Sequence, residues 1–311
     1  MLQIFVNANY DFVGKRRWFY LLSGGLVLLS LISILFRGGL TYGIDFTGGT
    51  LVQVRFDKPV SVETVRKGLD EISLGSNAVI QQFGDAQEYL IRLHQAGDNP
   101  ETLSKRVLAA LGKASGGNVE IRRLEFVGPQ VGRDLQLQAL YAVLAGMAGI
   151  LIYVAIRFHF RDGVISVAAI AHDIIVTLGA LSVTHREISL PVLAALLTIV
   201  GYSINDTIVI FDRIRETRAK GIRKGQNWAD LVNAAMNQTL SRTVLTSFTV
   251  FLSALVLLLF GGEVLHDFSF ALLVGVVTGT YSSIAAASLV MDWEMWSRAR
   301  ARATGKVQAK A

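Results

Sequence analysis

The sequence predicts an α-helical polytopic membrane protein, with six transmembrane helices and a ferredoxin-like α+β exported domain between the first and second helices. Hydrophobic residues make up 52% of the 311-residue chain and charged residues only 17%, whereas about 25% of a soluble domain is usually charged. Six windows are long and apolar enough to cross a bilayer. The first two windows are separated by a domain-sized segment in which strand and helix patterns alternate.

Each predicted transmembrane helix can span a hydrocarbon core of about 30 Å, which takes about 20 helical residues. The six windows cover 18–36, 137–156, 163–184, 188–211, 243–261 and 268–291. The first window is too long for a signal peptide and lacks the small-residue cleavage site, so we expect it to stay in the mature protein.

Lysine and arginine gather in alternate connections, and this pattern predicts the orientation of the helices. Basic residues precede the first window and follow the second, fourth and sixth, while 185–187 and 263–267 carry no basic excess. Because basic segments stay on the cytoplasmic side, we expect residues 1–17 and the basic tail 292–311 in the cytoplasm. The net charge of +6 lies outside 37–134, which favours attraction to membrane lipid and gives no support for a nucleic-acid partner.

Residues 37–134 are expected to form the exported, periplasmic domain. Strand patterns cover 51–56, 78–83, 87–93 and 118–127, and helical patterns cover 61–72 and 99–114. The resulting order, βαββαβ, is that of a ferredoxin-like unit, and Ser61 is expected to cap its first helix. A domain of this kind offers a binding surface more readily than a catalytic pocket.

The cytoplasmic connection 212–240 is partly amphipathic, with apolar residues at helical spacing from Trp228 to Met236. We expect it to lie along the membrane surface and to join the fourth and fifth helices. Close packing of the sixth helix is predicted by a stripe of small residues. The stripe consists of Gly275, Gly279, Ser282, Ser283 and Ala286.

The sequence contains no phosphate-binding loop, no zinc-protease motif and no nucleophile elbow. We therefore expect no enzymatic activity, no cofactor and no metal site. The candidate functional residues are instead ionisable groups at membrane depth. Asp206 lies near the cytoplasmic end of the fourth window and Arg242 at the start of the fifth, so the two can meet if these helices are neighbours.

A carboxylate in hydrocarbon costs at least about 2.5 kcal/mol and needs a partner, water or a proton. Two interpretations of Asp206 and Arg242 therefore stay open. In the first, Asp206 alternately faces water and arginine and acts as a proton-carrying switch. In the second, the two residues form a static pair that locks two helices. Asn205 and Ser203 are candidates for polar contacts with Asp206 or for hydrogen bonds between helices.

His172 and Asp173 lie near the middle of the third window. Adjacent residues of a helix project about 100° apart, so we expect their side chains not to share a face. Asp173 is the better candidate for an interior position, one turn from Thr177. Both are candidates for the proton pathway or for hydrogen-bonded helix packing.

Five motifs in chain order resemble the SecD/SecF family of protein-export membrane proteins. They are GIDFTGGT (43–50), EFVGPQVGRDL (125–135), AHDIIVTLG (171–179), VGYSINDTIVIFDRIRE (200–216) and SRTVLTS (241–247). The match covers nearly the whole chain. With six helices and one exported domain, the chain resembles the SecF half of the family.

The resemblance implies a multi-pass accessory subunit of the Sec preprotein translocase in the bacterial inner membrane, related to the resistance-nodulation-division transporters. Such a subunit forms a heterodimer with SecD and uses the proton-motive force to promote late steps of protein translocation. Further implied partners are the SecYEG translocon, YajC and a SecA-driven preprotein. The family's proton-pathway aspartate falls on Asp206 and its partner arginine on Arg242, which favours the switch interpretation.

Glycines flank the exported domain in two of these motifs. Gly48 and Gly49 precede its first strand, and Gly128 and Gly132 follow its last. Glycine adopts backbone angles that other residues avoid, so these positions are interpreted as hinges or as tight turns. Two other functions stay open: a proton-driven exporter of small molecules or lipids, and a scaffold subunit that transports nothing.

Overall fold

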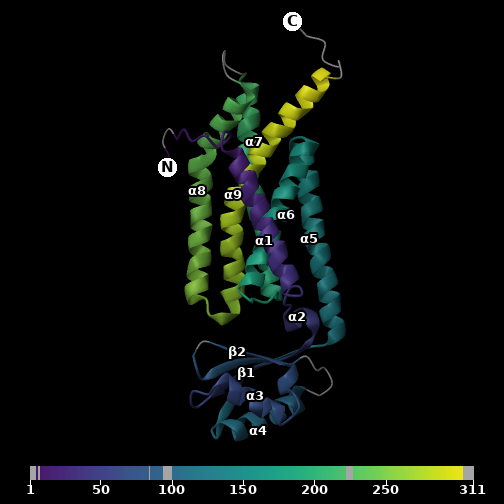
Figure 1. Ribbon diagram of the computed structural model, residues 1–311, viewed down its shortest axis with the longest axis vertical. Helices are drawn as coiled ribbons and strands as arrows, with labels where there is room; N and C mark the ends of the chain where they lie inside the picture. The colour runs from purple at the N-terminus through teal and green to yellow at the C-terminus, as the bar shows by residue number, and fades with distance from the viewer. Residues whose placement is uncertain (1–4, 6–7, 84, 94–99, 222–226, 304–311) are drawn as a thin grey trace. The chain divides into compact units, whose positions relative to one another are not determined.

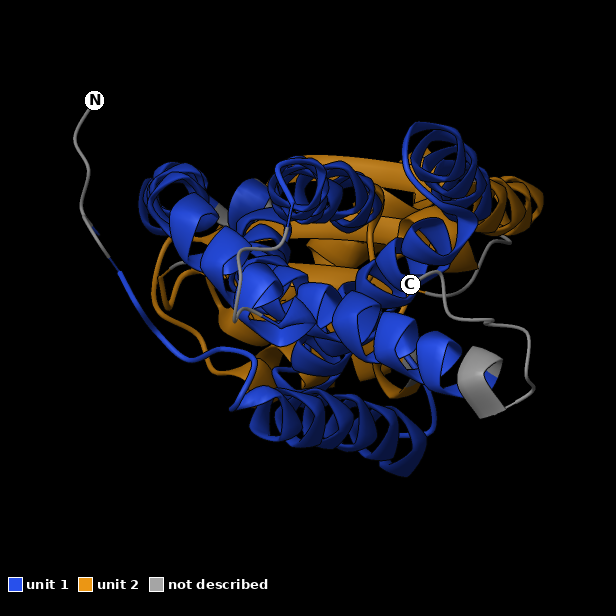
Figure 2. Cartoon of the chain, turned by 90° about the horizontal axis from the view of Figure 1, so that it is seen from above, with its two compact units in different colours: residues 1–40, 142–186, 191–311 blue, residues 41–141, 187–190 orange. Residues whose placement is uncertain are grey.

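The computed structural model describes residues 5, 8–83, 85–93, 100–221 and 227–303. It divides into two compact units, coloured separately in Figure 2. Unit 1 comprises 1–40, 142–186 and 191–311, and unit 2 comprises 41–141 and 187–190.

Six helices in the described part of the chain are long and apolar enough to cross a membrane, as the sequence predicted (Figure 1). They are α1 (Arg16–Phe36), α5 (Pro129–Arg157), α6 (Phe160–Val183), α7 (Leu190–Ala219), α8 (Trp228–Phe260) and α9 (Glu263–Ala303). The protein is therefore a multi-pass membrane protein. Helix α5 begins earlier than the apolar window because Pro129 occupies its first position, where a missing N–H costs nothing.

Within unit 1, α9 packs against both α6 and α8, and α1 packs against α6. Small residues permit close approaches between helices of this unit. A Cβ atom on Gly275 of α9 would collide with Ile199 of α7, and one on Gly179 of α6 would collide with Ser30 of α1. The predicted packing role of the small-residue stripe in α9 is therefore confirmed.

The connection 212–240 does not form a separate helix on the membrane surface. Helix α7 continues into it as far as Ala219, and α8 runs without interruption from Trp228. The apolar side chains expected to face the membrane are buried in a cluster with residues of α7 and α9. This cluster includes Trp228, Leu231, Val232, Ala235 and Met236 of α8, Ile210 and Ile214 of α7, and Ala287 and Met291 of α9.

Unit 2 contains the predicted ferredoxin-like domain. Its antiparallel sheet has the order β2-β3-β1-β4. The strands are β1 (Gly49–Phe56), β2 (Ala78–Gln82), β3 (Glu88–Leu93) and β4 (Val119–Val127). The remaining elements are α2 (Ile44–Thr47), α3 (Val62–Asp70), a short 3₁₀ turn (Gly75–Asn77) and α4 (Pro100–Ser115).

The core of unit 2 follows from alternation along β1, where Val52, Val54 and Phe56 all point inward. They pack against apolar residues of α3 and α4, among them Leu69 and Leu111. The N-cap of α3 is formed as predicted, because the hydroxyl of Ser61 accepts a hydrogen bond from the backbone N–H of Thr64.

A short stretch around the start of α7 also belongs to unit 2. The backbone N–H of Gly43 donates to the carbonyl of Ile188 at 2.8 Å, and the N–H of Ile188 donates to the carbonyl of Thr41 at 2.8 Å. The largely buried side chains of Arg92 and Glu187 form an ion pair. The connection between α6 and α7 is thus attached to the domain that follows α1.

Candidate functional site

Asp206 lies on α7 with its carboxylate buried among three helices and only 3% exposed. From α8, the hydroxyl of Thr246 lies 3.5 Å from Oδ1 and that of Ser247 lies 3.3 Å from Oδ2. Ser247 in turn accepts a hydrogen bond of 2.7 Å from the hydroxyl of Thr280 on α9. A chain of hydroxyl groups therefore links the Asp206 carboxylate to α8 and α9.

Arg242 lies on α8 one turn before Thr246, whose hydroxyl donates to the Arg242 carbonyl at 2.9 Å. The side chain of Arg242 is exposed. Within the described residues, however, no direct ion pair joins Arg242 to Asp206. Helices α7 and α8 are neighbours as expected, but hydroxyls rather than the guanidinium contact the carboxylate.

Asp173 on α6 is a second carboxylate inside the helical unit and is fully buried, which confirms its expected interior position. Its Oδ2 accepts hydrogen bonds from Ser203 of α7 at 2.6 Å and Ser282 of α9 at 2.8 Å. Thr177 donates instead to the backbone carbonyl of Asp173. Three helices therefore meet at this carboxylate.

The expectation that the His172 and Asp173 side chains do not share a face is wrong. Nδ1 of His172 lies 2.9 Å from Oδ1 of Asp173. Their Cβ atoms diverge by about 100° around the helix, but the imidazole ring and the carboxylate are both long enough to turn toward each other. The other ring nitrogen of His172 is buried and has no hydrogen-bond partner among the described groups.

The polar face of α7 connects the surroundings of the two carboxylates. Ser203 bonds to Asp173 rather than to Asp206, and Thr207 lies 3.1 Å from the hydroxyl of Ser283 on α9. Asn205 is exposed and lies away from this face. One residue along a helix turns the side chain by about 100°, which is why the neighbour of Asp206 in sequence does not accompany it into the interior.

The sequence analysis did not predict the hydroxyl contacts that four residues make at this site. These residues are Thr246, Ser247, Thr280 and Ser283. A usable signal existed, because hydroxyls within apolar helices must find acceptors on their own or on neighbouring helices. A groove of about 260 Å³ opens beside Ser247 and Thr280, and the rest of its lining is apolar. In the described part of the chain, no group of three or more His, Cys, Asp or Glu residues could hold a metal ion.

The flanking glycines make a close contact inside unit 2. Gly48 and Gly49 have positive φ angles of +72° and +132°. A Cβ atom on Gly48 would lie 2.7 Å from Cα of Pro129, and one on Gly132 would lie 2.8 Å from the carbonyl oxygen of Phe46. Close approach therefore explains Gly48 and Gly132, while the hinge interpretation of the four glycines stays a prediction.

Comparison with known proteins identifies similar sequences along most of the chain. Residues 107–296 match the C-terminal model of the protein export membrane protein SecD/SecF, and residues 32–60 match the SecD/SecF GG motif. Protein translocase subunit SecF of Calditerrivibrio nitroreducens is 46% identical, over 91% of this chain and 93% of the relative. The SecF subunit of Vibrio alginolyticus is 48% identical, over 80% of this chain and 78% of the relative.

Solved structures show the same similarity. The crystal structure of SecDF from Thermus thermophilus, a translocon-associated membrane protein, has a TM-score of 0.83 and 43% identity over 93% of this chain. A second structure, SecDF in a super-membrane-facing form, has a TM-score of 0.68 and 41% identity over 97% of this chain. The present chain spans 39% and 41% of those two SecDF chains.

Proposed function

This chain belongs to the SecD/SecF family of protein-export membrane proteins, and we propose that it couples the proton-motive force to late steps of protein translocation through Asp206. Its relatives are the SecF subunits of protein translocases. The observation that carries the proposal is a carboxylate buried between membrane-spanning helices, whose hydrogen-bond partners among the described residues are hydroxyl groups.

Two opposing influences act on this carboxylate. Burial in a membrane-spanning helix penalises a charged carboxylate, whereas a positive charge brought close to it favours the charged form. A modest movement of α8 relative to α7 would change the distance between Arg242 and Asp206. The Asp206 carboxylate would then bind or release a proton. An ion pair already closed at contact distance would hold Asp206 charged and leave less room for such a change.

The groove beside Ser247 and Thr280 supports a route by which a proton reaches Asp206. Thr280 donates to Ser247, which lies 3.3 Å from the carboxylate, so adjacent hydroxyls extend from the groove to Asp206. We assign the proton to Asp206 rather than to Asp173, because Asp173 has short contacts to Ser203, Ser282 and His172 that hold it in place. In this proposal, Asp173 and His172 position α6, α7 and α9.

The proposed assembly contains a second half. This chain spans 39% of the SecDF chain to which it is similar, and SecD would supply the complementary helices. The proposed partners are SecD, the SecYEG translocon, YajC and a preprotein driven by SecA. The proposed location is the bacterial inner membrane with both termini in the cytoplasm, as the distribution of basic residues favours.

The test is secretion of a reporter protein by membrane vesicles that contain SecD together with either the natural chain or Asp206→Asn. Export is measured with and without an imposed proton gradient, after co-purification shows that the variant still assembles with SecD. Glu216→Gln is the matched control, because it removes an exposed carboxylate from the same helix. We expect Asp206→Asn to lose the gradient-dependent part of export and Glu216→Gln to keep it.

A full gradient response from assembled Asp206→Asn would show that the residue is structural. That result would leave the scaffold function as the better interpretation. Equal losses in both variants would instead point to a general requirement for negative charge on α7 and would contradict a specific role for Asp206.

A further inference from the structure

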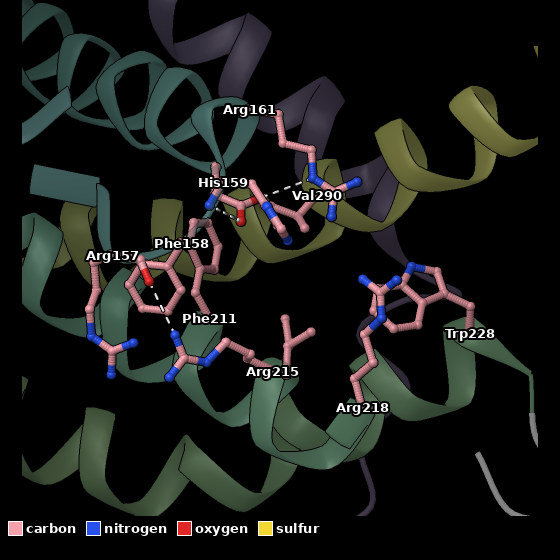
Figure 3. Close-up of a pocket in the computed structure, with 11 residues that line it drawn as sticks. Arg157, Phe158, His159, Arg161, Phe211, Arg215, Arg218, Trp228 and Val290 are labelled. Atoms are coloured by element: carbon pink, nitrogen blue, oxygen red, sulfur yellow. Dashed lines mark hydrogen bonds and ion pairs between the residues drawn. The ribbon is translucent and has the colours of Figure 1, made fainter. Parts of the chain in front are cut away.

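A cavity of about 180 Å³ lies in unit 1 where α5 ends and α6 begins (Figure 3). Arg157 is the last residue of α5 and His159 is the N-cap of α6. The cavity therefore lies at the turn between two membrane-spanning helices, where lipid headgroups are expected. Four arginines contribute to its wall: Arg157, Arg161, Arg215 and Arg218.

Positive charge exceeds negative charge around the cavity. Asp162 is the one carboxylate among its lining residues. Within the lining, Asp162 pairs with Arg161 at 3.2 Å. Outside it, Asp212 pairs with Arg157 at 3.2 Å and Arg215 at 3.7 Å. Glu294 pairs with Arg161, with Arg218 at 3.6 Å and with Arg298 at 2.9 Å. Even with these groups included, five arginines face three carboxylates, an excess that attracts an anion.

One wall of the cavity also holds a buried donor without an acceptor. Trp228 is 7% exposed, and among the described groups its indole N–H has no hydrogen-bond partner. Figure 3 shows this nitrogen beside the guanidinium of Arg218, which lies 5.3 Å from the Trp228 ring. A buried donor left unpaired is costly, so binding that brings an acceptor oxygen to this nitrogen would be favoured.

The remaining wall is apolar and aromatic. Phe158 and Phe211 pack edge to face with ring centroids 6.3 Å apart. The guanidinium groups of Arg157 and Arg215 lie 5.1 Å and 5.5 Å from the Phe158 ring. The occupant should therefore combine an anionic group with an apolar part. A planar guanidinium fits two oxygens of a phosphate at once, which favours a phosphate as the anion.

We propose that this cavity binds the phosphate group of an anionic phospholipid. Basic pockets between transmembrane helices are suited to such headgroups, and the aromatic wall would contact the glycerol and the first acyl carbons. The site is separate from Asp206, and its occupancy does not depend on proton coupling. A soluble phosphate shares the anionic chemistry but leaves the aromatic wall uncovered.

The test is native mass spectrometry of the purified full chain in a neutral detergent, with phosphatidylglycerol, phosphatidylcholine or inorganic phosphate added in separate titrations. The test variant is Arg215→Gln with Arg218→Gln. Its control is Arg213→Gln with Lys220→Gln, which removes one charge near the end of α7 and one just after it, both outside the cavity lining. Trp228→Phe removes the unpaired donor and keeps an aromatic ring.

We expect phosphatidylglycerol to bind the natural chain and the control, and to bind the double cavity variant roughly tenfold more weakly. Trp228→Phe should weaken binding by a smaller factor. If the double variant does not fold, Arg215→Gln alone takes its place, since that side chain is half exposed. Equal phosphatidylglycerol binding by the cavity and control variants would overturn the proposal. Preferential, arginine-dependent binding of inorganic phosphate would overturn its assignment to a lipid.

Discussion

Hydroxyl groups distinguish the buried carboxylates of Asp173 and Asp206. Asp173 accepts hydrogen bonds of 2.6 Å and 2.8 Å from serines on two other helices, whereas the hydroxyls around Asp206 lie at 3.3 Å and 3.5 Å. Shorter contacts to a charged acceptor are stronger. Asp173 is therefore the better fixed of the two, and Asp206 is the more easily moved from its contacts, as the proposed proton switch requires.

Replacing Ser203 with alanine tests the structural role of Asp173. The change removes the 2.6 Å hydrogen bond to a fully buried carboxylate and should destabilise the protein by about 1.5–3 kcal/mol. Thr198→Ala is the matched control, because this hydroxyl is exposed and its one hydrogen bond among the described residues is to the Ala194 carbonyl of its own helix. Thermal unfolding in one detergent compares the two. A Ser203 variant as stable as the Thr198 variant would contradict the role assigned to this bond.

The sequence identified the acidic groups of the site but not their partners. Asp173 and Asp206 were recognisable because each interrupts an apolar run. The partners depend on how α6, α7, α8 and α9 are rotated about their axes, and one sequence does not show that rotation. Ser203 illustrates the difference, since it lies three residues before Asp206 yet bonds to Asp173.

Close approach between elements explains two of the four flanking glycines. In unit 2, the chain around Gly48 contacts the first turn of α5 so closely that a Cβ atom on Gly132 would lie 2.8 Å from the backbone nitrogen of Gly48. Nothing lies within 4 Å of a Cβ atom placed on Gly128. A Cβ atom at position 132 therefore requires the backbone to shift, whereas one at position 128 does not.

A pair of alanine substitutions separates packing from flexibility. Gly132→Ala forces backbone atoms apart and should destabilise unit 2 by about 1–3 kcal/mol. Gly128→Ala should leave stability unchanged or raise it slightly, because it has space and restricts the unfolded chain. Thermal unfolding of the full chain measures both effects. Reduced export by a fully stable Gly128→Ala would favour the hinge interpretation, and a stable Gly132→Ala would argue against the packing account.

At the level of elements, periodicity predicted where the helices lie in the chain more reliably than it predicted what packs against them. The apolar spacing from Trp228 to Met236 correctly indicated a helix with one apolar face. The predicted surroundings of that face were wrong, because Ile214 of α7 and Met291 of α9 cover it in place of the membrane surface. The same composition suits burial against lipid or against another helix, so the pattern alone does not distinguish them.

The chain passes between the two units at four places, after residues 40, 141, 186 and 190. Two of these crossings were expected, because the sequence predicted a domain inserted between the first two membrane-spanning helices. The other two arise because 187–190 belongs to unit 2, and no sequence pattern indicated this attachment. The chain therefore connects unit 2 to α6 and α7 at this short stretch as well as to α1 and α5.

Breaking the ion pair between Arg92 and Glu187 tests whether this attachment transmits the effect of Asp206. Both side chains are nearly buried, at 11% and 12% exposed, and removing one partner of a buried pair typically costs about 3–5 kcal/mol. In Glu187→Gln, amide hydrogen exchange at 187–190 and around Thr41 should therefore become faster. Glu71→Gln is the control, because it breaks an exposed pair with Lys113 within the same unit.

The same two variants, assembled with SecD, then distinguish a mechanical role from a structural one. If 187–190 transmits movement, Glu187→Gln should lose much of the gradient-dependent export while Asp206 and its hydroxyl contacts remain intact. The Glu71→Gln control should export normally, since a surface ion pair contributes little. Faster exchange with unchanged export would show that the stretch only completes the fold of unit 2. Unchanged exchange would show that the backbone hydrogen bonds of Ile188, rather than the ion pair, hold it there.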